Sequence, residues 1–329
     1  MKTKLIYLLT GIVLVSGMYF TKTDDMDKDT LVLIEKALEI DSKLELWPGY
    51  KLGKYPIDVN YENVEFRYFK GDIIEKKPTL EVLAFTAWVD EGQPVVKVLP
   101  ESMLSQVLNV MGNMSSEKME YHYIKALFHE GFHAFQIERG IISDIDSFQA
   151  NNEFEANNIH KTNNSPELNP HSEDNKENSS SYEKFLNILY LLDNDIKYRK
   201  LWTEEEKSLM DYFKNNNKEG WVKCHNRRVK YLKEVLGDDF DFYIKMENDR
   251  ELVEGTARYI EDKIMDILTG KVDEISVSVI YSKGVSKFYT TGRIKCLILD
   301  KNSNFQDNDW KENLFNSQST LTDLLMHPY

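Results

Sequence analysis

The chain has 329 residues, of which 41% are hydrophobic and 12% aromatic, so it is long and apolar enough to bury a globular core. Its 55 acidic residues outnumber its 41 basic residues and give a formal net charge of −14. Binding to nucleic acid or to anionic lipid depends on clustered cationic side chains, and this charge balance argues against both. We therefore expect no nucleic-acid partner.

The first 20 residues differ from the rest of the chain. Lys2 and Lys4 precede an apolar run, LIYLLTGIVLVSGMYF, which is followed by the polar sequence TKTDD. This order is typical of a secretory signal peptide, and the run could also remain in place as a membrane anchor. We expect residues 1–20 to be either a signal peptide or an N-terminal anchor. In both cases the rest of the chain would be extracytoplasmic, secreted or held at the outer face of the membrane.

The hydrophobic pattern predicts an α+β protein in which a small mixed sheet precedes a mainly helical lobe. Helical spacing predicts a first helix over residues 29–44. Short strands are expected at 57–59 and 64–68, and a hairpin at 80–89 and 94–99 around the turn sequence DEGQ. A longer helix is expected over 117–139, with Gly140 placed to end it.

The stretch 151–181 is rich in Asn, Ser, Glu and Pro and has no apolar periodicity, so we expect a flexible polar insert. Helical periodicity returns at 182–192, 204–213, 221–236 and 247–268. Residues 275–281 fit either a strand or an apolar helix, and helices are expected at 289–299 and 310–325. The two cysteines, Cys224 and Cys296, could pair in an oxidising compartment or stay free, and they are too few for a cysteine-based zinc site.

The motif that indicates chemistry lies in the sequence FHEGFHAFQ, where His129, Glu130 and His133 form H-E-x-x-H within the helix expected at 117–139. Residues four apart lie on one helical face, so both imidazoles can bind a single metal ion. The glutamate beside the first histidine can then act as the general base toward a water activated by that ion. Seven histidines in the whole chain make a chance match of this kind rare.

A third metal ligand must come from elsewhere in the chain. The metzincin continuation of the motif would need a glycine and a histidine where the chain has Gln136 and Arg139, so that class is excluded. The downstream sequence ELVEGTARYIE offers Glu254 and, one helical turn earlier, Glu251. His160 and His171 lie in the polar insert, where holding a metal ligand would cost ordering entropy. His122, His225 and His327 are better explained as packing or surface residues.

These two motifs together resemble the gluzincins, zinc peptidases with a thermolysin-like catalytic core, and among them bacterial families whose second motif reads roughly E-G-x-A-x-Y. The resemblance spans about residues 80–297 and implies a zincin-like fold, one zinc ion and Glu254 as the third ligand. It also implies a Tyr or His that stabilises the oxyanion, for which Tyr289 and Tyr281 are candidates, although either could be a core tyrosine. One departure is Arg258, which stands where thermolysin-type enzymes have an acidic residue that orients the first histidine.

The sequence therefore predicts a zinc-dependent peptidase, with a peptide or protein as substrate and Glu130 as general base. Zincins commonly bind the scissile peptide along a strand edge, which the segment 80–89 would supply. The aminopeptidase signature G-x-M-x-N is absent upstream, which argues against that subclass. The alternative is a catalytically inactive, zinc-bound binding or sensor module on the cell surface. Glu130 favours the enzyme, since an inactive protein has no chemical need for it.

Overall fold

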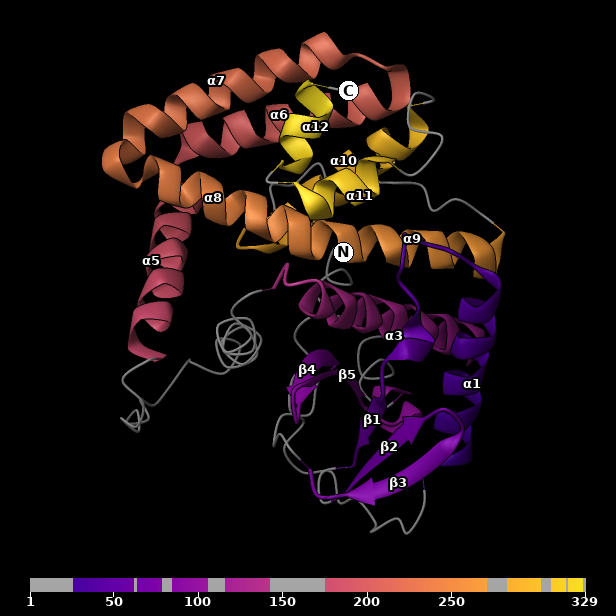
Figure 1. Cartoon of the computed structure of the whole chain (residues 1–329). Helices are drawn as coiled ribbons and strands as arrows, with labels where there is room; N and C mark the ends of the chain where they lie inside the picture. The colour runs from indigo at the N-terminus through magenta and orange to yellow at the C-terminus, as the bar shows by residue number, and fades with distance from the viewer. Residues whose placement is uncertain are drawn as a thin grey trace. The chain divides into compact units, whose positions relative to one another are not determined.

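The computed structural model describes residues 26–61, 64–78, 85–105, 116–142, 175–270, 283–302, 309–317 and 319–327. They form the expected α+β protein, with a small sheet followed by a large set of helices (Figure 1). The chain divides into two compact units. The first comprises residues 1–176 and 263–271, and the second comprises residues 177–262 and 272–329.

Among the described residues of the first unit, five strands form a sheet in the order β3-β2-β1-β5-β4. The strands are β1 (Ile57–Asn60), β2 (Glu65–Phe69), β3 (Asp72–Lys76), β4 (Thr86–Asp90) and β5 (Gln93–Val98). The pair β1 and β5 is parallel and the other pairs are antiparallel, so the sheet is mixed, as predicted. The strands expected at 57–59 and 64–68 and the hairpin around DEGQ are confirmed. Positions 80–84 of the strand expected at 80–89 lie outside the described residues.

Strand β3 was not expected from the sequence. Its residues are mostly exposed, so it lacks the apolar alternation that marks a half-buried strand. The signal lay instead in the preceding Lys70-Gly71 pair, where φ is +53° and +91°. Positive φ at both central residues is the type I′ turn that suits two-residue hairpins, and Glu91-Gly92 repeats it between β4 and β5.

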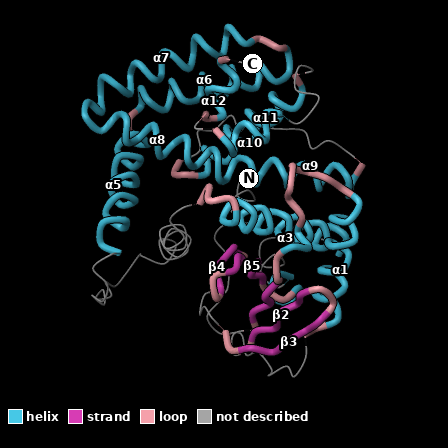
Figure 2. Tube along the Cα trace, viewed as in Figure 1, coloured by secondary structure: helices cyan, strands magenta, loops and turns pink. Residues whose placement is uncertain are grey.

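Helix α3 (Ser116–Glu138) packs on β5 and β4, and α1 (Lys28–Lys43) packs against α3 (Figure 2). Both helices were predicted, and Gly140 follows α3 with φ +67°. Alternate strand residues supply the buried apolar face of the sheet: Ile57, Val59, Phe66, Tyr68, Ala87, Val96 and Val98. The hydroxyl of Tyr123 on α3 donates to the carbonyl oxygen of Leu99 at 2.8 Å, which ties the helix to the end of β5.

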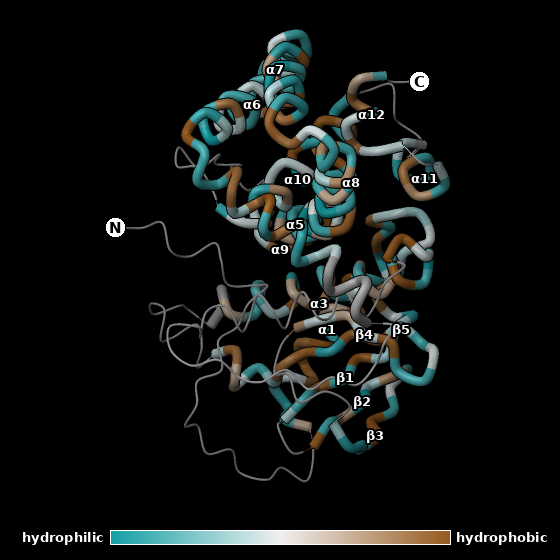
Figure 3. The backbone as a smooth tube through the Cα atoms, turned by 90° about the vertical axis from the view of Figure 1, so that its left-hand side faces the viewer, coloured by the Kyte–Doolittle hydropathy of each residue, from teal (hydrophilic) through white to brown (hydrophobic). Residues whose placement is uncertain are grey.

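The remaining helices are α5 (Asn175–Asn194), α6 (Ile196–Asn215), α7 (Lys218–Leu236), α8 (Phe240–Arg250), α9 (Thr256–Thr269), α10 (Ser286–Lys301), α11 (Asp309–Asn316) and α12 (Leu321–Met326). A five-residue π-helix, η3 (Glu251–Gly255), joins α8 to α9. Helices α6 and α7 lie side by side, and both alternate hydrophilic and hydrophobic residues along their length (Figure 3). The helices predicted in this part of the chain are confirmed, most of them longer than expected, and the tail expected at 310–325 is two helices.

A buried ionic cluster holds the second unit together. Arg228, on α7, is 1% exposed and pairs with Glu205 on α6 and, in a two-pronged contact at 2.9 and 2.6 Å, with Glu247 on α8. The ammonium of Lys287 on α10 lies 2.7 Å from Asp193 on α5. Because buried charges are tolerated only when they are paired, the first set of contacts fixes α6, α7 and α8 relative to one another, and the second fixes α10 relative to α5.

The polar insert expected at 151–181 overlaps the first turns of α5. Residues 151–174 lie outside the described residues, but α5 begins at Asn175, so 175–181 are helical. These residues are polar and carry no periodicity, which is why the pattern missed them. Buried residues such as Tyr182 and Phe185 stabilise α5 by tertiary packing. Once the helix has formed, adding polar residues to its N-terminal end costs little free energy, because their helix propensities are only slightly unfavourable.

Several other expectations fall outside the described residues, among them the signal or anchor at 1–20 and the element at 275–281. Among the helices that the structure describes, none is long and apolar enough to cross a membrane. Cys224 and Cys296 are both free thiols, and Cys296 is buried. Of the two alternatives left open by the sequence, the structure has the unpaired one.

Candidate metal centre

The H-E-x-x-H motif lies on a stretch of α3 that is buried on every side, since residues 126–137 are all buried. His129, Glu130 and His133 are only 2–4% exposed. A helix buried all round is normally apolar, and polar side chains in such a position cost several kcal/mol unless they are paired. The burial therefore indicates that these polar residues have a role other than solubility.

The positions between the motif residues serve packing. A Cβ atom on Gly131 would lie 2.5 Å from Cδ1 of Leu52 and 2.8 Å from the hydroxyl oxygen of Tyr50, so only glycine allows this approach. The Tyr50 hydroxyl donates to the carbonyl oxygen of Phe128 at 3.1 Å. The rings of Trp47 and Tyr50 each meet Phe132 edge-on at 5.2 Å. The segment that follows α1 therefore packs against α3 at the motif and fixes the orientation of its histidines.

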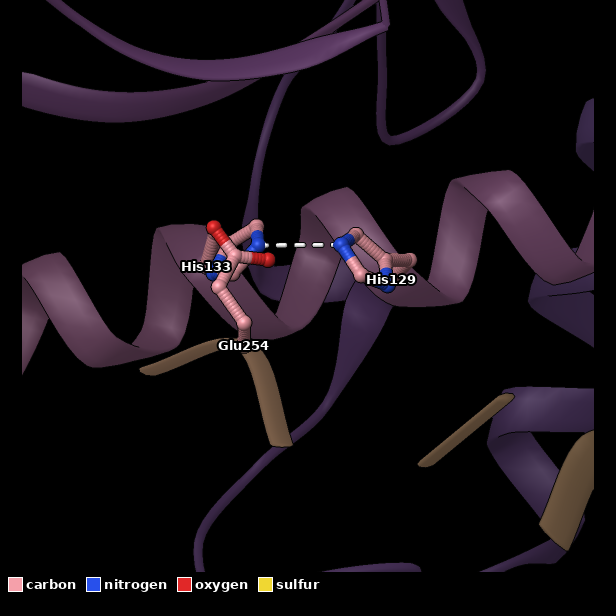
Figure 4. Close-up of side chains that lie close together, drawn as sticks. All are labelled: His129, His133 and Glu254. Carbon is pink, nitrogen blue, oxygen red and sulfur yellow. Dashed lines mark hydrogen bonds between the residues drawn. The ribbon is translucent and has the colours of Figure 1, made fainter. Parts of the chain in front are cut away.

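The two imidazoles face each other on successive turns of α3. Their Nε2 atoms are 3.0 Å apart, as the dashed line in Figure 4 marks. On its other side, Nδ1 of His133 lies 2.7 Å from Oε1 of Gln136, one turn further along the helix. An amide oxygen can only accept, so Nδ1 of His133 carries the proton and Nε2 presents its lone pair. That lone pair is the electron pair that a metal ion would take.

Glu254 lies in the π-helix η3 and is 1% exposed. Short π-helical segments inside α-helices are uncommon and are frequent at functional sites. The guanidinium of Arg250, one turn earlier, lies 3.9 Å from Oε1 of Glu254. Gly255 follows directly, and its backbone lies against Gly292 on α10. The local sequence thus holds a buried carboxylate at a defined place.

Glu251, the rival third ligand, is engaged elsewhere. Its carboxylate accepts a hydrogen bond from the Thr291 hydroxyl at 2.6 Å and pairs with the ammonium of Lys295, both on α10. Lys295 also donates to the hydroxyl of Thr322 on α12 at 2.8 Å. The side chain is 2% exposed. These contacts make Glu251 a packing residue that joins η3 to α10.

One ligand atom from each of His129, His133 and Glu254 lies within 4.8 Å of the other two, and all three residues are buried. Figure 4 shows the carboxylate of Glu254 directed toward the two imidazoles. Donor atoms about 2.0–2.1 Å from a tetrahedral ion are about 3.3 Å apart, close to the 3.0 Å between the two Nε2 atoms. Two neutral imidazoles and a carboxylate also form a known donor set. The group could therefore hold a metal ion.

The other residues singled out from the sequence have mixed outcomes. Tyr289 lies on α10 and is 6% exposed, whereas Tyr281, His160 and His171 fall outside the described residues. His225 does have a packing role, with Nδ1 2.9 Å from Oε1 of Glu205, and His122 is half-buried on α3.

Arg258, which stands in place of an expected acidic residue, donates to Oε2 of Glu261 at 2.5 Å. Burial lowers its pKa, but the carboxylate of Glu261, followed by Tyr289 and Glu254, raises it, so the net pKa lies above the usual value. Arg258 is therefore a fixed positive charge near Glu254. The partner of a motif histidine is instead Gln136, which sequence reasoning used only to exclude metzincins. Its position three residues after His133 was the available signal.

No protein-family model, curated protein or solved structure matches this chain significantly.

Proposed function

We propose that this protein is a zinc-dependent peptidase of gluzincin type, with a zincin-like fold and one zinc ion held by His129, His133 and Glu254. The observation that carries the proposal is the buried group of these three side chains, with Glu130 next to His129 on the same helix. Two histidines and a glutamate are the donor set of catalytic zinc sites in which the fourth position is left for water or substrate. Structural zinc sites usually close with four protein ligands.

When bound there, zinc supplies a Lewis acid that polarises the scissile carbonyl and lowers the pKa of water to roughly 7. The chain's own residues do the rest. The carboxylate of Glu130 accepts the proton of the attacking water and later delivers it to the nitrogen of the leaving amine. The burial of Glu130 keeps bulk water from competing for that proton, and it strengthens the electrostatic interactions of the carboxylate.

Substrate binding is proposed at the outer edge of β4, which ends the described sheet. An extended peptide could add there as a further strand, with main-chain hydrogen bonds holding the scissile bond in position. Tyr289 is the candidate donor to the oxyanion among the described residues, and Tyr281 remains the candidate outside them. The substrate would be a peptide or protein met outside the cytoplasm, because residues 1–20 have the order of a signal peptide or anchor.

The test combines metal analysis with cleavage of a peptide library, read by mass spectrometry with and without a zinc chelator. The protein is expected to contain about one zinc per chain and to cut peptides only when the metal is present. Glu130→Gln should keep the metal and lose nearly all cleavage, since the amide cannot accept the proton. His133→Ala should lose the metal. Glu120→Gln, a change of the same type near the surface of α3, is the matched control and should cleave normally.

Three outcomes separate the alternatives. A protein that holds zinc but cuts nothing is the inactive binding or sensor module. A protein that binds no transition metal after metal-replete expression contradicts the central proposal. Cleavage by Glu130→Gln at the wild-type rate would remove Glu130 from the role of general base while leaving the metal site in place.

A further inference from the structure

Gln136 lies one helical turn after His133 on α3 and is fully buried. Its Oε1 atom lies 2.7 Å from Nδ1 of His133. We propose that Gln136 is a positioning residue of the metal centre, which fixes both the tautomer and the ring orientation of His133. This role in metal binding rests on the proposed function, but the hydrogen bond between Gln136 and His133 can be tested without a metal.

The physical argument starts from the two nitrogens of a neutral imidazole, of which one donates and the other accepts. A metal ligand must present its lone pair to the ion. If Nδ1 had no fixed acceptor, His133 could carry its proton on Nε2, or flip its ring, and neither form would bind the ion through that atom. The amide oxygen of Gln136 accepts only from the form with the proton on Nδ1. The lone pair of His133 Nε2, which lies 3.0 Å from Nε2 of His129, is then available to a metal ion.

A neutral amide suits this place because the centre already contains two buried carboxylates, those of Glu130 and Glu254. A further negative charge in the same buried region would need its own counter-charge. The amide holds the tautomer without adding that charge. Residues that orient metal-binding histidines typically contribute 10–100-fold to metal affinity.

Gln136 also has a structural role, which must be separated from the positioning role. Its backbone carbonyl accepts from the backbone N–H of Ile141 at 2.9 Å, where the helix ends. Side-chain substitutions leave that bond intact. Tyr123→Phe supplies the matched control, because Tyr123 is a buried polar residue of the same helix whose hydroxyl bonds to Leu99 and not to a motif histidine.

The experiment measures zinc affinity by competition with a chelator, for wild type, Gln136→Leu, Gln136→Glu and Tyr123→Phe. We expect Gln136→Leu to weaken zinc binding about 10–100-fold. Gln136→Glu keeps an acceptor for Nδ1–H and should retain most of the affinity, but its added buried charge should lower thermal stability. Tyr123→Phe should lower thermal stability but leave the affinity unchanged. Wild-type affinity in a folded Gln136→Leu protein would overturn the inference while leaving the proposed function intact.

A second measurement uses the metal-free protein and does not depend on zinc. Nitrogen-15 NMR of the imidazoles distinguishes Nδ1–H from Nε2–H tautomers, and His133 in the wild type should be the Nδ1–H form. In Gln136→Leu, or in Gln136→Met if the leucine variant does not fold, the resonance should move toward a mixture of the two forms. An Nε2–H tautomer of His133 in the wild type would contradict the positioning role. Absence of zinc binding by a wild type with the expected tautomer would instead contradict the proposed function.

Discussion

Gly255 and Gly292 approach so closely that a Cβ atom on Gly255 would lie 2.5 Å from the Cα atom of Gly292. In the other direction, a Cβ atom on Gly292 would lie 2.5 Å from the carbonyl oxygen of Glu251. In both cases the added Cβ atom would meet a backbone atom, which cannot move aside as the end of a flexible side chain can. The π-helix η3 therefore lies on α10 only because both positions are glycine, and the residue beside Gly255 is Glu254.

Gly255→Ala is expected to destabilise the protein by about 1–3 kcal/mol, because the added methyl group must push η3 away from α10. The same displacement would move Glu254 and should weaken metal binding. Chemical denaturation and chelator competition measure the two effects. Gly53→Ala is the matched control, since its Cβ atom would meet its nearest neighbours at an ordinary 3.6 Å. Equal stabilities for Gly255→Ala and the control would show that the close approach is relaxed in solution.

Glu254→Gln and Glu251→Gln distinguish the two candidates for the third ligand. Glu254→Gln should reduce the bound metal substantially, because a neutral amide is a poorer ligand than a carboxylate. Glu251→Gln should keep its metal, since the amide can still accept from Thr291, but it should lower stability because Lys295 loses its counter-charge. Metal content per chain and melting temperature are the measurements. Loss of metal from Glu251→Gln alone would reverse the assignment.

The sequence predicted those features of the site that depend only on the local geometry of a helix. His129 and His133 are four residues apart on a helix, and that spacing alone places their rings on one face. Gln136 follows the same rule but was missed, because glutamine rarely signals chemistry on its own. The preference for Glu254 over Glu251 came from a resemblance and not from spacing. The physical difference between the two residues is a tertiary contact: Glu251 binds Thr291 and Lys295 on α10.

The fold shows the same division between local and tertiary causes. Helix α1 could be predicted because its buried residues recur at helical spacing, and the end of α3 could be predicted from Gly140. The π-helix η3 could not, since nothing in the sequence ELVEG differs from ordinary helix formers apart from its glycine. Its form depends on the approach of α10, which lies far along the chain. The parallel pairing of β1 with β5 likewise depends on contacts between distant residues.

Arg228→Met tests the ionic cluster of the second unit. The substitution would leave Glu205 and Glu247 buried without their shared cation, and loss of one partner of a buried pair typically costs about 3–5 kcal/mol. Arg227→Met is the matched control, because Arg227 is half exposed and pairs with Glu204 at the surface, where an ion pair contributes about 0–1 kcal/mol. Urea denaturation of both variants measures the difference. Similar losses from the two substitutions would contradict the assigned role of Arg228.

Glu206 on α6 should make the stability of the protein depend on pH. Burial raises the pKa of its carboxyl to about 7, against a partial opposing effect of the cations of Lys207 and Lys287. Between the ordinary pKa of 4.5 and about 7, the folded protein holds a proton that the unfolded chain has released. Stability is therefore lost as the pH rises through this window, and the loss stays constant above it.

Glu206→Gln removes this titration and isolates its contribution from that of every other group. The variant should match the wild type near pH 4.5 and become more stable than it as the pH rises to about 7, by roughly 3 kcal/mol at most, since each unit of pKa corresponds to about 1.4 kcal/mol. Denaturation curves for both proteins across this range measure the difference. Glu204→Gln, on the same helix but partly exposed, should change stability by less than about 1 kcal/mol. A constant difference between Glu206→Gln and the wild type from about pH 4.5 to 8 would mean that the Glu206 carboxylate finds compensation when it ionises, and the burial of this side chain would then carry no penalty.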